Sequence, residues 1–231
     1  MKRKNVLFGV SICLAMALVT CSLLAGTQRR LHREAIAVQL DDQKPIVALT
    51  FDDGPNPRYT PQVLDVLYAH QVPATFFLVG ENLRENELLV REMHASGHEI
   101  ESHTFSHPDL TTLDAEQIQE EIRLSRDALR EILPDYSLRY LRPPYGRYTQ
   151  QVECASDLPL LLWTIDSGDW LHPDAQAIYT TVVTHVQDGD ILVFHDDNDQ
   201  TAQALERIIP ELKARGFQFA TVSQLLAARA A

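Results

Sequence analysis

The chain has 231 residues, which is enough for one large domain or two small ones. Residues 1–38 carry six Lys and Arg against one Glu, and the remainder holds 14 basic and 31 acidic residues, a net of −17. This balance argues against a nucleic-acid-binding protein, which needs a basic face, and favours neutral or cationic partners.

The N-terminus has the pattern of a signal anchor. Residues 1–5 include Lys2, Arg3 and Lys4, and residues 6–25 contain no charge. Twenty apolar residues match one helix across a bilayer, and the basic end is expected in the cytoplasm. Residues 26–44 then form a linker, and residues 45–231 form a folded domain outside the cytoplasm. Cleavage of the apolar segment as a signal peptide, which would release a secreted protein, stays open.

Cysteines give the folded domain no internal disulfide. Cys13 and Cys21 lie in the apolar segment, so only Cys154 falls within the domain. A domain of this size can bury enough apolar surface without a disulfide.

Strand-like and helix-like stretches alternate through the rest of the chain. This alternation predicts an α/β domain with a parallel sheet, either closed as a barrel or open. No Gly-x-Gly-x-x-Gly or phosphate-loop pattern occurs, which disfavours a nucleotide cofactor. The predicted strands are Ile46–Phe51, Ala74–Val79, Glu99–Ser102, Tyr140–Arg142, Leu160–Ile165, Ile191–Phe194 and Phe217–Thr221.

Helix signals separate these strands. Asp114 and Gln117 have capping-box spacing, Gly97 and Gly216 are helix-stop residues, and Pro210 is expected to kink the last helix. The predicted helices are Pro61–His70, Leu83–Ser96, Asp114–Leu133, Ala175–Val186 and Thr201–Arg215.

Chemically active residues follow the predicted strands, where a parallel barrel places its functional groups. Asp52 and Asp53 end the first strand before Gly54, and two such carboxylates side by side disfavour each other's ionisation unless a cation lies nearby. His103 and His107 follow the third strand at a spacing that can chelate a divalent metal. With Asp53 they form a two-imidazole, one-carboxylate set, which leaves positions open for water. Zinc, or a similar metal such as cobalt, fits this set.

Later strand ends add further polar groups. Arg142 precedes a Pro143-Pro144 turn, after which Tyr145 supplies the first free N–H, since proline has none. Asp169 follows the fifth strand, and His195 ends the sixth. A surface proline turn and a hydrogen-bonded core histidine are the alternative interpretations of these two features.

Five blocks together resemble the polysaccharide deacetylase family, the family 4 carbohydrate esterases with the NodB-homology domain. The resemblance spans residues 46–226 in the family's order and implies a distorted (β/α) barrel of about seven strands. It also implies a metal-dependent N- or O-deacetylase. The blocks are Thr50-Phe51-Asp52-Asp53-Gly54, His103-x-x-x-His107, Arg142-Pro143-Pro144-Tyr145-Gly146, Asp166-x-x-Asp169-Trp170 and Leu192-Val193-Phe194-His195.

The resemblance also implies residue roles. Metal ligands correspond to Asp53, His103 and His107; the general base to Asp52, held by Arg142; and the general acid to His195, paired with Asp169. The Tyr145 N–H corresponds to an oxyanion donor. The substrate-binding positions are Pro144, Tyr145, Trp170 and Val193, where the family often has Leu in place of Val193.

An outward-facing enzyme of this kind is expected to deacetylate N-acetylglucosamine in peptidoglycan or a chitin-like glycan. O-deacetylation of acetylxylan or an exopolysaccharide is one alternative. A membrane-tethered, inactive carbohydrate-binding protein is another, although the chain keeps every residue whose loss would inactivate it. A glycosidase also uses two carboxylates but has no need of the His103 and His107 pair.

Overall fold

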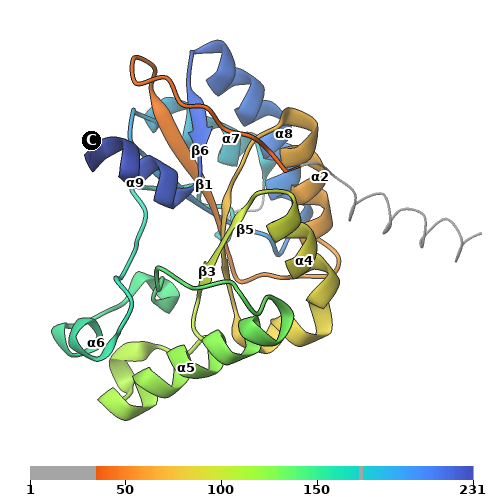
Figure 1. Ribbon diagram of the computed structural model, residues 1–231. Helices are drawn as coiled ribbons and strands as arrows, with labels where there is room; N and C mark the ends of the chain where they lie inside the picture. Colours follow the sequence, from red (N-terminus) through yellow and green to blue (C-terminus); the bar gives the residue numbers. More distant parts are fainter. Residues whose placement is uncertain (1–34, 172–173, 231) are drawn as a thin grey trace, which may run out of the picture. The chain divides into compact units, whose positions relative to one another are not determined.

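The computed structural model describes residues 35–171 and 174–230 (Figure 1). Its strands form a parallel α/β sheet in which neighbours follow the order β3-β2-β1-β5-β4, with β6 beside the first half of β1. The strand pairings in this part of the chain are parallel. The strands are β1 (Ile46–Asp52), β2 (Thr75–Leu78), β3 (Glu99–Ser102), β4 (Ile165–Asp166), β5 (Ile191–His195) and β6 (Gln218–Ala220).

Isolated bridges continue the sheet beyond β3. Leu141 pairs with Ser102 on one side and with Leu160 on the other, and Leu160 lies five residues before β4. Bridges therefore connect β3 to the segment that leads into β4, and β4 in turn pairs with β5. The α/β class and parallel sheet predicted from the sequence are thus confirmed.

Two predicted strands are shorter than expected. Residues 140–142 contribute only the bridge at Leu141, and the predicted Leu160–Ile165 strand is reduced to β4 and the bridge at Leu160. The guanidinium of Arg142 explains the second difference, because it donates to the carbonyls of Leu161 and Leu162 (both 3.2 Å). These carbonyls are then not used in a strand ladder. The short pairing at residues 140–142 is explained by Pro143 and Pro144, since neither can donate a hydrogen bond to a neighbouring strand.

The two faces of β1 pack into different clusters, because successive side chains of a strand point to opposite faces. Val47, Leu49 and Phe51 join the large cluster beneath the helices, and the Phe51 ring stacks on two phenylalanines of neighbouring strands. Ile46 and Ala48 join a smaller cluster with residues of β5, β6 and the last helix. Strand β1 is thereby packed on both faces at its start, and the large cluster continues along one face to Phe51, next to Asp52.

Helices surround the sheet (Figure 1). The predicted capping box is confirmed: the Asp114 side chain accepts from the Gln117 N–H, and the Gln117 side chain accepts from the Asp114 N–H. The last helix, α9, packs near the start of β1, at the opposite end from Asp52. The helices are α2 (Thr60–His70), α3 (Gly80–Leu83), α4 (Glu87–Ala95), α5 (Ala115–Ile132), α6 (Gln150–Ala155), α7 (Ala175–His185), α8 (Asp199–Ala214) and α9 (Val222–Ala230), with 3₁₀ turns η1 (Arg84–Asn86), η2 (Leu110–Thr112) and η3 (Pro144–Gly146).

One helical prediction is wrong, two helices were not predicted, and the kink expected at Pro210 stays a prediction. The expected Leu83–Ser96 helix is divided into α3, η1 and α4. The short helices α6 and α9 were not predicted, since α6 has only six residues and α9 has little apolar periodicity. Helix α8 continues through Pro210.

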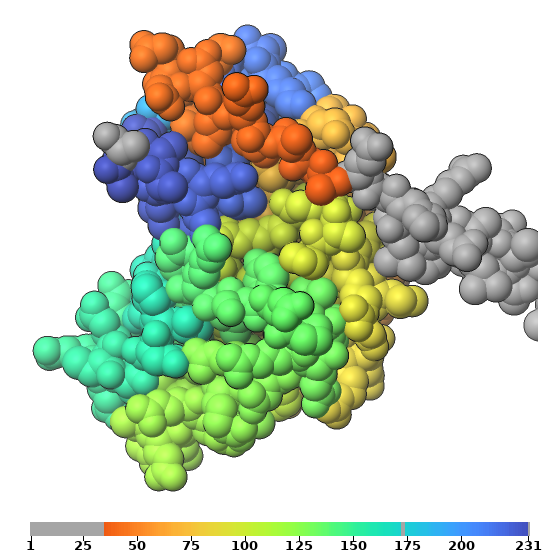
Figure 2. Space-filling view, in the orientation of Figure 1, coloured from red at the N-terminus to blue at the C-terminus, as the bar shows by residue number. Residues whose placement is uncertain are grey.

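The first described residues pack on the rest of the domain. Ile36 is buried, and its N–H donates to the Ser96 carbonyl after α4 (2.9 Å). The Asp41 N–H donates to the Gln218 side chain of β6 (2.8 Å). Figure 2 shows this orange segment against the yellow surface of α4 and beside the blue surface of α9.

The predicted membrane anchor, residues 6–25, lies outside the described residues. Within residues 35–171 and 174–230, no helix has both the length and the apolar character that crossing a membrane requires.

Candidate active site

Polar side chains from four strand ends meet around one cavity of about 460 Å³. Asp52 ends β1, His103 follows β3, Asp166 ends β4 and His195 ends β5. The sequence-based expectation that chemical groups gather at the carboxyl ends of the strands is therefore confirmed. The cavity is lined by Asp52, Asp53, His103, His107, Tyr145, Arg147, Trp163, Asp166, Trp170 and His195.

Asp52 is buried and paired with a cation. Its Oδ1 accepts from Nη1 of Arg142 (2.7 Å), and the same nitrogen donates to Thr50 Oγ1 (2.8 Å). Arg142 has no exposed surface, and its guanidinium lies 3.9 Å from the centre of the Phe77 ring. Bonds from the guanidinium to the carbonyls of residues 161 and 162 occupy further N–H groups. The carboxylate of Asp52 is therefore fixed in place with its charge compensated.

Asp53 faces two imidazoles. Its Oδ1 lies 3.4 Å from Nε2 of His103 and 3.2 Å from Nε2 of His107, and the three possible ligand atoms lie within 4.8 Å of one another. This buried oxygen has no hydrogen bond of good geometry. Burial alone raises the pKa of Asp53, but the two histidines outweigh it and hold that pKa well below its usual range.

The backbone around these three residues is unusual. Asp53 and His107 adopt left-handed conformations, with φ of 72° and 58°, as does Thr104 at 68°. Adjacent strand residues point to opposite faces, so the left-handed turn at Asp53 lets both aspartates line the same cavity. The Thr104 hydroxyl accepts from the His107 N–H (3.0 Å) and fixes the second turn.

This donor set suits a divalent metal. Nδ1 of His103 is hydrogen-bonded to the Arg142 carbonyl (2.8 Å), which fixes the ring with Nε2 toward Asp53. Such a second hydrogen bond is the usual support of a metal-bound histidine. An unpaired carboxylate oxygen facing two imidazole nitrogens matches a three-ligand catalytic zinc site. The residues Asp53, His103 and His107 would hold the ion.

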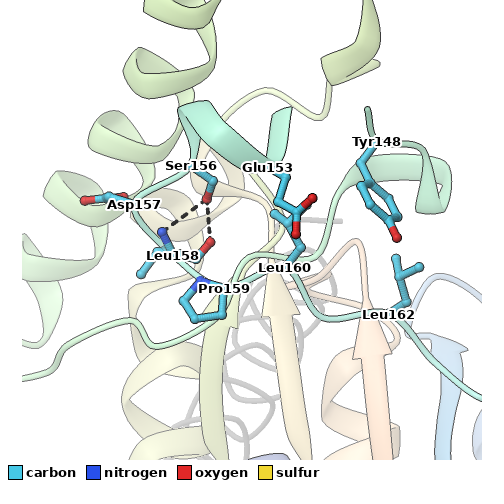
Figure 3. A pocket seen from close by; sticks show the side chains of 8 residues that line it. All are labelled: Tyr148, Glu153, Ser156, Asp157, Leu158, Pro159, Leu160 and Leu162. Carbon is cyan, nitrogen blue, oxygen red and sulfur yellow. Dashed lines mark hydrogen bonds between the residues drawn. The ribbon is translucent and has the colours of Figure 1, made fainter. Parts of the chain in front are cut away.

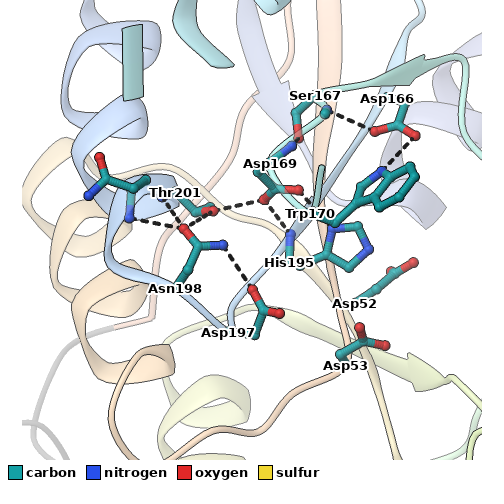
Figure 4. Close-up of polar contacts among 12 residues, drawn as sticks. Asp52, Asp53, Asp166, Ser167, Asp169, Trp170, His195, Asp197, Asn198 and Thr201 are labelled. Carbon is teal, nitrogen blue, oxygen red and sulfur yellow. Dashed lines mark hydrogen bonds and ion pairs between the residues drawn. The ribbon is translucent and has the colours of Figure 1, made fainter. Parts of the chain in front are cut away.

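His195 is held by a carboxylate. Its Nδ1 is hydrogen-bonded to Asp169 Oδ1 (2.8 Å), and its N–H donates to Asp169 Oδ2 (2.7 Å; Figure 4). The Thr201 hydroxyl donates to the same Oδ2 (2.7 Å). Burial alone lowers the pKa of His195, but the hydrogen bond and charge of Asp169 raise it to about 9. The imidazole is therefore protonated at neutral pH and can donate a proton.

The predicted substrate-binding residues are divided between the cavity and its surroundings. Tyr145 and Trp170 line the cavity and are 60% and 58% exposed, as expected of groups that meet a substrate. Pro144 and Val193 are buried and do not line it. Val193 instead pairs in the sheet with Thr50 and Asp166, so its predicted contact with the acetyl methyl stays a prediction.

Three lining residues were given no role from the sequence. Asp166 accepts from the Gly168 N–H (2.9 Å) and from Nε1 of Trp170 (3.3 Å), so it supports the exposed indole. Trp163 lies two residues before β4, and Arg147 is ion-paired with Asp109 (2.9 Å). Asp166 belongs to the Asp166-x-x-Asp169-Trp170 block, Arg147 directly follows Gly146, and Trp163 lies three residues before Asp166; this proximity to the motifs was the available signal.

Asp196 is a further buried acid beside the site. Its carboxylate is hydrogen-bonded to the Thr60 hydroxyl and lies where a side chain on Gly54 would project, 2.6 Å from the ideal Cβ position. Burial raises the pKa of Asp196 to about 7. A Cβ at residue 54 would therefore force the buried Asp196 carboxylate to move.

The fold and the cavity define an α/β enzyme with a candidate metal site at the carboxyl ends of its strands. The family model described as Polysaccharide deacetylase matches residues 39–162. The chain belongs to this family, and it is a polysaccharide deacetylase by class.

Known relatives agree with this membership. The chain is 39% identical over 196 residues to a chitooligosaccharide deacetylase of Sinorhizobium fredii, covering 78% of this chain and 91% of the relative. The peptidoglycan deacetylase PdaC of Bacillus subtilis has a similar structure, with a TM-score of 0.79, 33% identity and coverage of 82% and 94%. A family 4 acetyl xylan esterase of Clostridium thermocellum, solved with a cobalt ion, is also similar. Its TM-score is 0.76 at 32% sequence identity, and the match covers 79% of this chain and 90% of the esterase.

Proposed function

We propose that the protein removes N-acetyl groups from N-acetylglucosamine units of a chitin-like oligosaccharide or of peptidoglycan. This proposal rests on three groups of side chains that lie around one cavity. Asp53 lies with two histidines, Asp52 is paired with Arg142, and His195 is paired with Asp169. These are the groups that hydrolysis of an unreactive amide requires. The similarity to a chitooligosaccharide deacetylase and to a peptidoglycan deacetylase supports the substrate class.

Asp53, His103 and His107 would hold a divalent metal, for which zinc is proposed; when bound, it would polarise the acetyl carbonyl as a Lewis acid and lower the pKa of water from near 16 toward about 7. Asp52 then takes the proton of the attacking water as general base. Its buried ion pair with Arg142 keeps the carboxylate in one orientation. Asp52 Oδ2 lies 4.0 Å from Nε2 of His103, so the base is next to the ligand set.

The Tyr145 N–H is proposed as the oxyanion donor. In η3 the N–H groups of Gly146 and Arg147 donate to the carbonyls of Pro143 and Pro144, and that of Tyr145 lies outside these bonds. Tyr145 is left-handed, with φ of 62°. A donor of this kind lowers the barrier by about 3–4 kcal/mol when it is aimed at the developing charge.

His195 completes the reaction as general acid. Its protonated imidazole donates to the departing amine, and Asp169 holds the ring through Nδ1, so Nε2 is free to donate. Trp170 and Tyr145 then form the exposed walls against which the sugar lies.

Acetate release from the full chain tests this function. Zinc-loaded protein should release acetate from chitooligosaccharides or peptidoglycan, and a chelator should stop the reaction until zinc is returned. Acetylated xylan is assayed in parallel to test for O-deacetylation. This second candidate function is supported by the similarity to an acetyl xylan esterase. Turnover that survives full chelation would refute the metal-dependent mechanism.

The location of the enzyme is a separate proposal that rests on the sequence. The uncharged residues 6–25 are proposed to anchor the protein with its catalytic domain outside the cytoplasm, where cell-wall glycan is found. Fractionation and external protease treatment of cells test this placement. Recovery of the protein in the medium would indicate signal cleavage instead.

A further inference from the structure

A second cavity, of about 380 Å³, lies outside the catalytic residues (Figure 3). This volume falls within the range of small-ligand sites. Helix α6, the loop that follows it and residues 160–162 surround the cavity. Its lining residues are Tyr148, Glu153, Ser156, Asp157, Leu158, Pro159, Leu160 and Leu162.

The second cavity borders the active site. Arg147 lines the active-site cavity and Tyr148 lines the second one; likewise Trp163 lines the first and Leu162 the second. Two stretches of backbone therefore separate the cavities, with neighbouring residues facing each side. In Figure 3 the Tyr148 ring lies beside Leu162, at this border.

Exposed apolar side chains gather around the same region. Among the large hydrophobic residues that are exposed in the described part of the chain, Tyr145, Tyr148, Trp170 and Leu171 lie on the two loops beside the active site. Tyr145 and Trp170 line the active-site cavity, and Tyr148, 47% exposed, extends the aromatic surface toward the second cavity. Amphipathic aromatic rings of this kind suit contact with sugar faces.

The second cavity is also lined by an exposed carboxylate, Glu153, that has no ion pair among the described residues. Asp157 is paired with Arg126 (2.8 Å), whereas Glu153 takes part in none of the ion pairs between described residues. No Lys or Arg lines the cavity, and Figure 3 shows the Glu153 carboxylate between Leu160 and Tyr148. An acceptor beside apolar and aromatic walls suits a ligand with hydroxyl or ammonium donors and disfavours an anion.

We infer that this second cavity is a distal subsite for a further sugar unit of the same glycan, with Tyr148 against the ring and Glu153 accepting from its polar groups. The inference rests on the proposed function. It makes the enzyme selective for longer oligosaccharides, because short ones fill the active-site cavity without reaching Tyr148.

Chain-length dependence tests the subsite. The zinc-loaded full chain is assayed for acetate release from chitobiose through chitohexaose. Tyr148→Ala should lower kcat/KM about tenfold for the hexaose and less than twofold for the biose, and Glu153→Gln should give the same pattern with a smaller loss, about threefold. Leu88→Ala and Glu206→Gln, exposed residues on α4 and α8, are matched controls and should change neither substrate.

A binding measurement tests the subsite without requiring turnover. Calorimetric titration of the hexaose into Asp52→Asn protein should show about tenfold weaker binding when Tyr148→Ala is added, with the biose unchanged. Equal losses for every chain length, or no loss for the hexaose in either assay, would overturn the subsite. Absence of acetate from every glycan would instead overturn the proposed function, and the titration would still decide the subsite.

Discussion

Asp52 and Asp53 are neighbours in sequence but occupy opposite electrostatic environments. Asp52 is 2% exposed and bonded to a guanidinium with no exposed surface, so its charge is compensated within the protein. Asp53 has a side chain that is 37% exposed, and its Oδ1 faces two imidazole nitrogens without a good hydrogen bond. Asp52, the inner carboxylate, is therefore held in one position by Arg142, whereas Asp53, the outer carboxylate, can receive a ligand.

Removing the outer carboxylate should have the largest effect. Asp53→Ala deletes one of three candidate ligands, and we expect zinc affinity to fall by more than about 100-fold, beyond the loss typical of supporting residues. Acetate release should then fall to the level of chelated wild-type protein. Zinc titration and an acetate assay measure both quantities. Unchanged zinc affinity would show that Asp53 is not a ligand.

Neutralising the inner carboxylate should separate chemistry from metal binding. Asp52→Asn keeps the size of the side chain and an acceptor for Arg142, and should reduce turnover by a factor of about 10²–10⁴, the usual contribution of a general base. Zinc should bind as in the wild type. Loss of zinc together with activity would mean that the two aspartates have exchanged roles. A thermal melt serves as the control, because Arg142 loses its buried counter-ion.

Asp169 extends the comparison to a third carboxylate, which is buried and paired like Asp52. Asp169→Asn should return the pKa of His195 from about 9 toward its ordinary value, near 6.5. The alkaline limb of the pH–rate profile should therefore move to lower pH, with about 30-fold slower turnover at pH 8, because the protonated fraction of His195 falls from about 90% to about 3%. An unmoved limb would show that another group sets it.

The same shift predicts a pH dependence of stability. A histidine whose pKa is raised by folding adds stability that is fully present below its unfolded value, near pH 6.5, and is lost as the pH rises through about 9. Urea unfolding at pH 6 and pH 9.5 should show a larger decline for the wild type than for Asp169→Asn.

The smallest effect on turnover is expected at Thr201, which contacts Asp169 and not the reacting groups themselves. Thr201→Val keeps the shape of the side chain but removes the hydroxyl that donates to Asp169 (2.7 Å). We expect about tenfold slower turnover with little change in zinc affinity, since the hydroxyl hydrogen-bonds to Asp169 and not to a candidate metal ligand. A loss of zinc would contradict the separation of the two halves of the site.

The sequence could predict features that depend on local pattern. The Asp114 capping box needs only residues three apart, and strand ends were visible because apolar runs stop at Asp52 and His195. The expected strand at residues 160–165 failed because a side chain from elsewhere in the chain, Arg142, takes two of its carbonyls. No local pattern reports such competition.

Site residues were predictable to different degrees for the same reason. Residue types and spacing brought Asp53, His103 and His107 together as a metal set, and the structure places them within reach of one another. The difference between Asp52 and Asp53 needed the family resemblance, because it depends on Arg142, 90 residues away, and on a left-handed turn. The second cavity was not predicted, since it forms between α6 and a segment outside the sheet ladder.

The left-handed residues carry a consequence for engineering. Asp53, Thr104, His107 and Tyr145 all have positive φ, a conformation that costs an L-residue about 1–2 kcal/mol. Their sum is a substantial share of the roughly 5–15 kcal/mol that stabilises a typical domain. We therefore expect substitutions that relax these turns to raise thermal stability and to lower turnover. Directed evolution for heat resistance alone would relax these turns first, whereas selection for turnover would retain them and gather its stabilising substitutions in the outer helices.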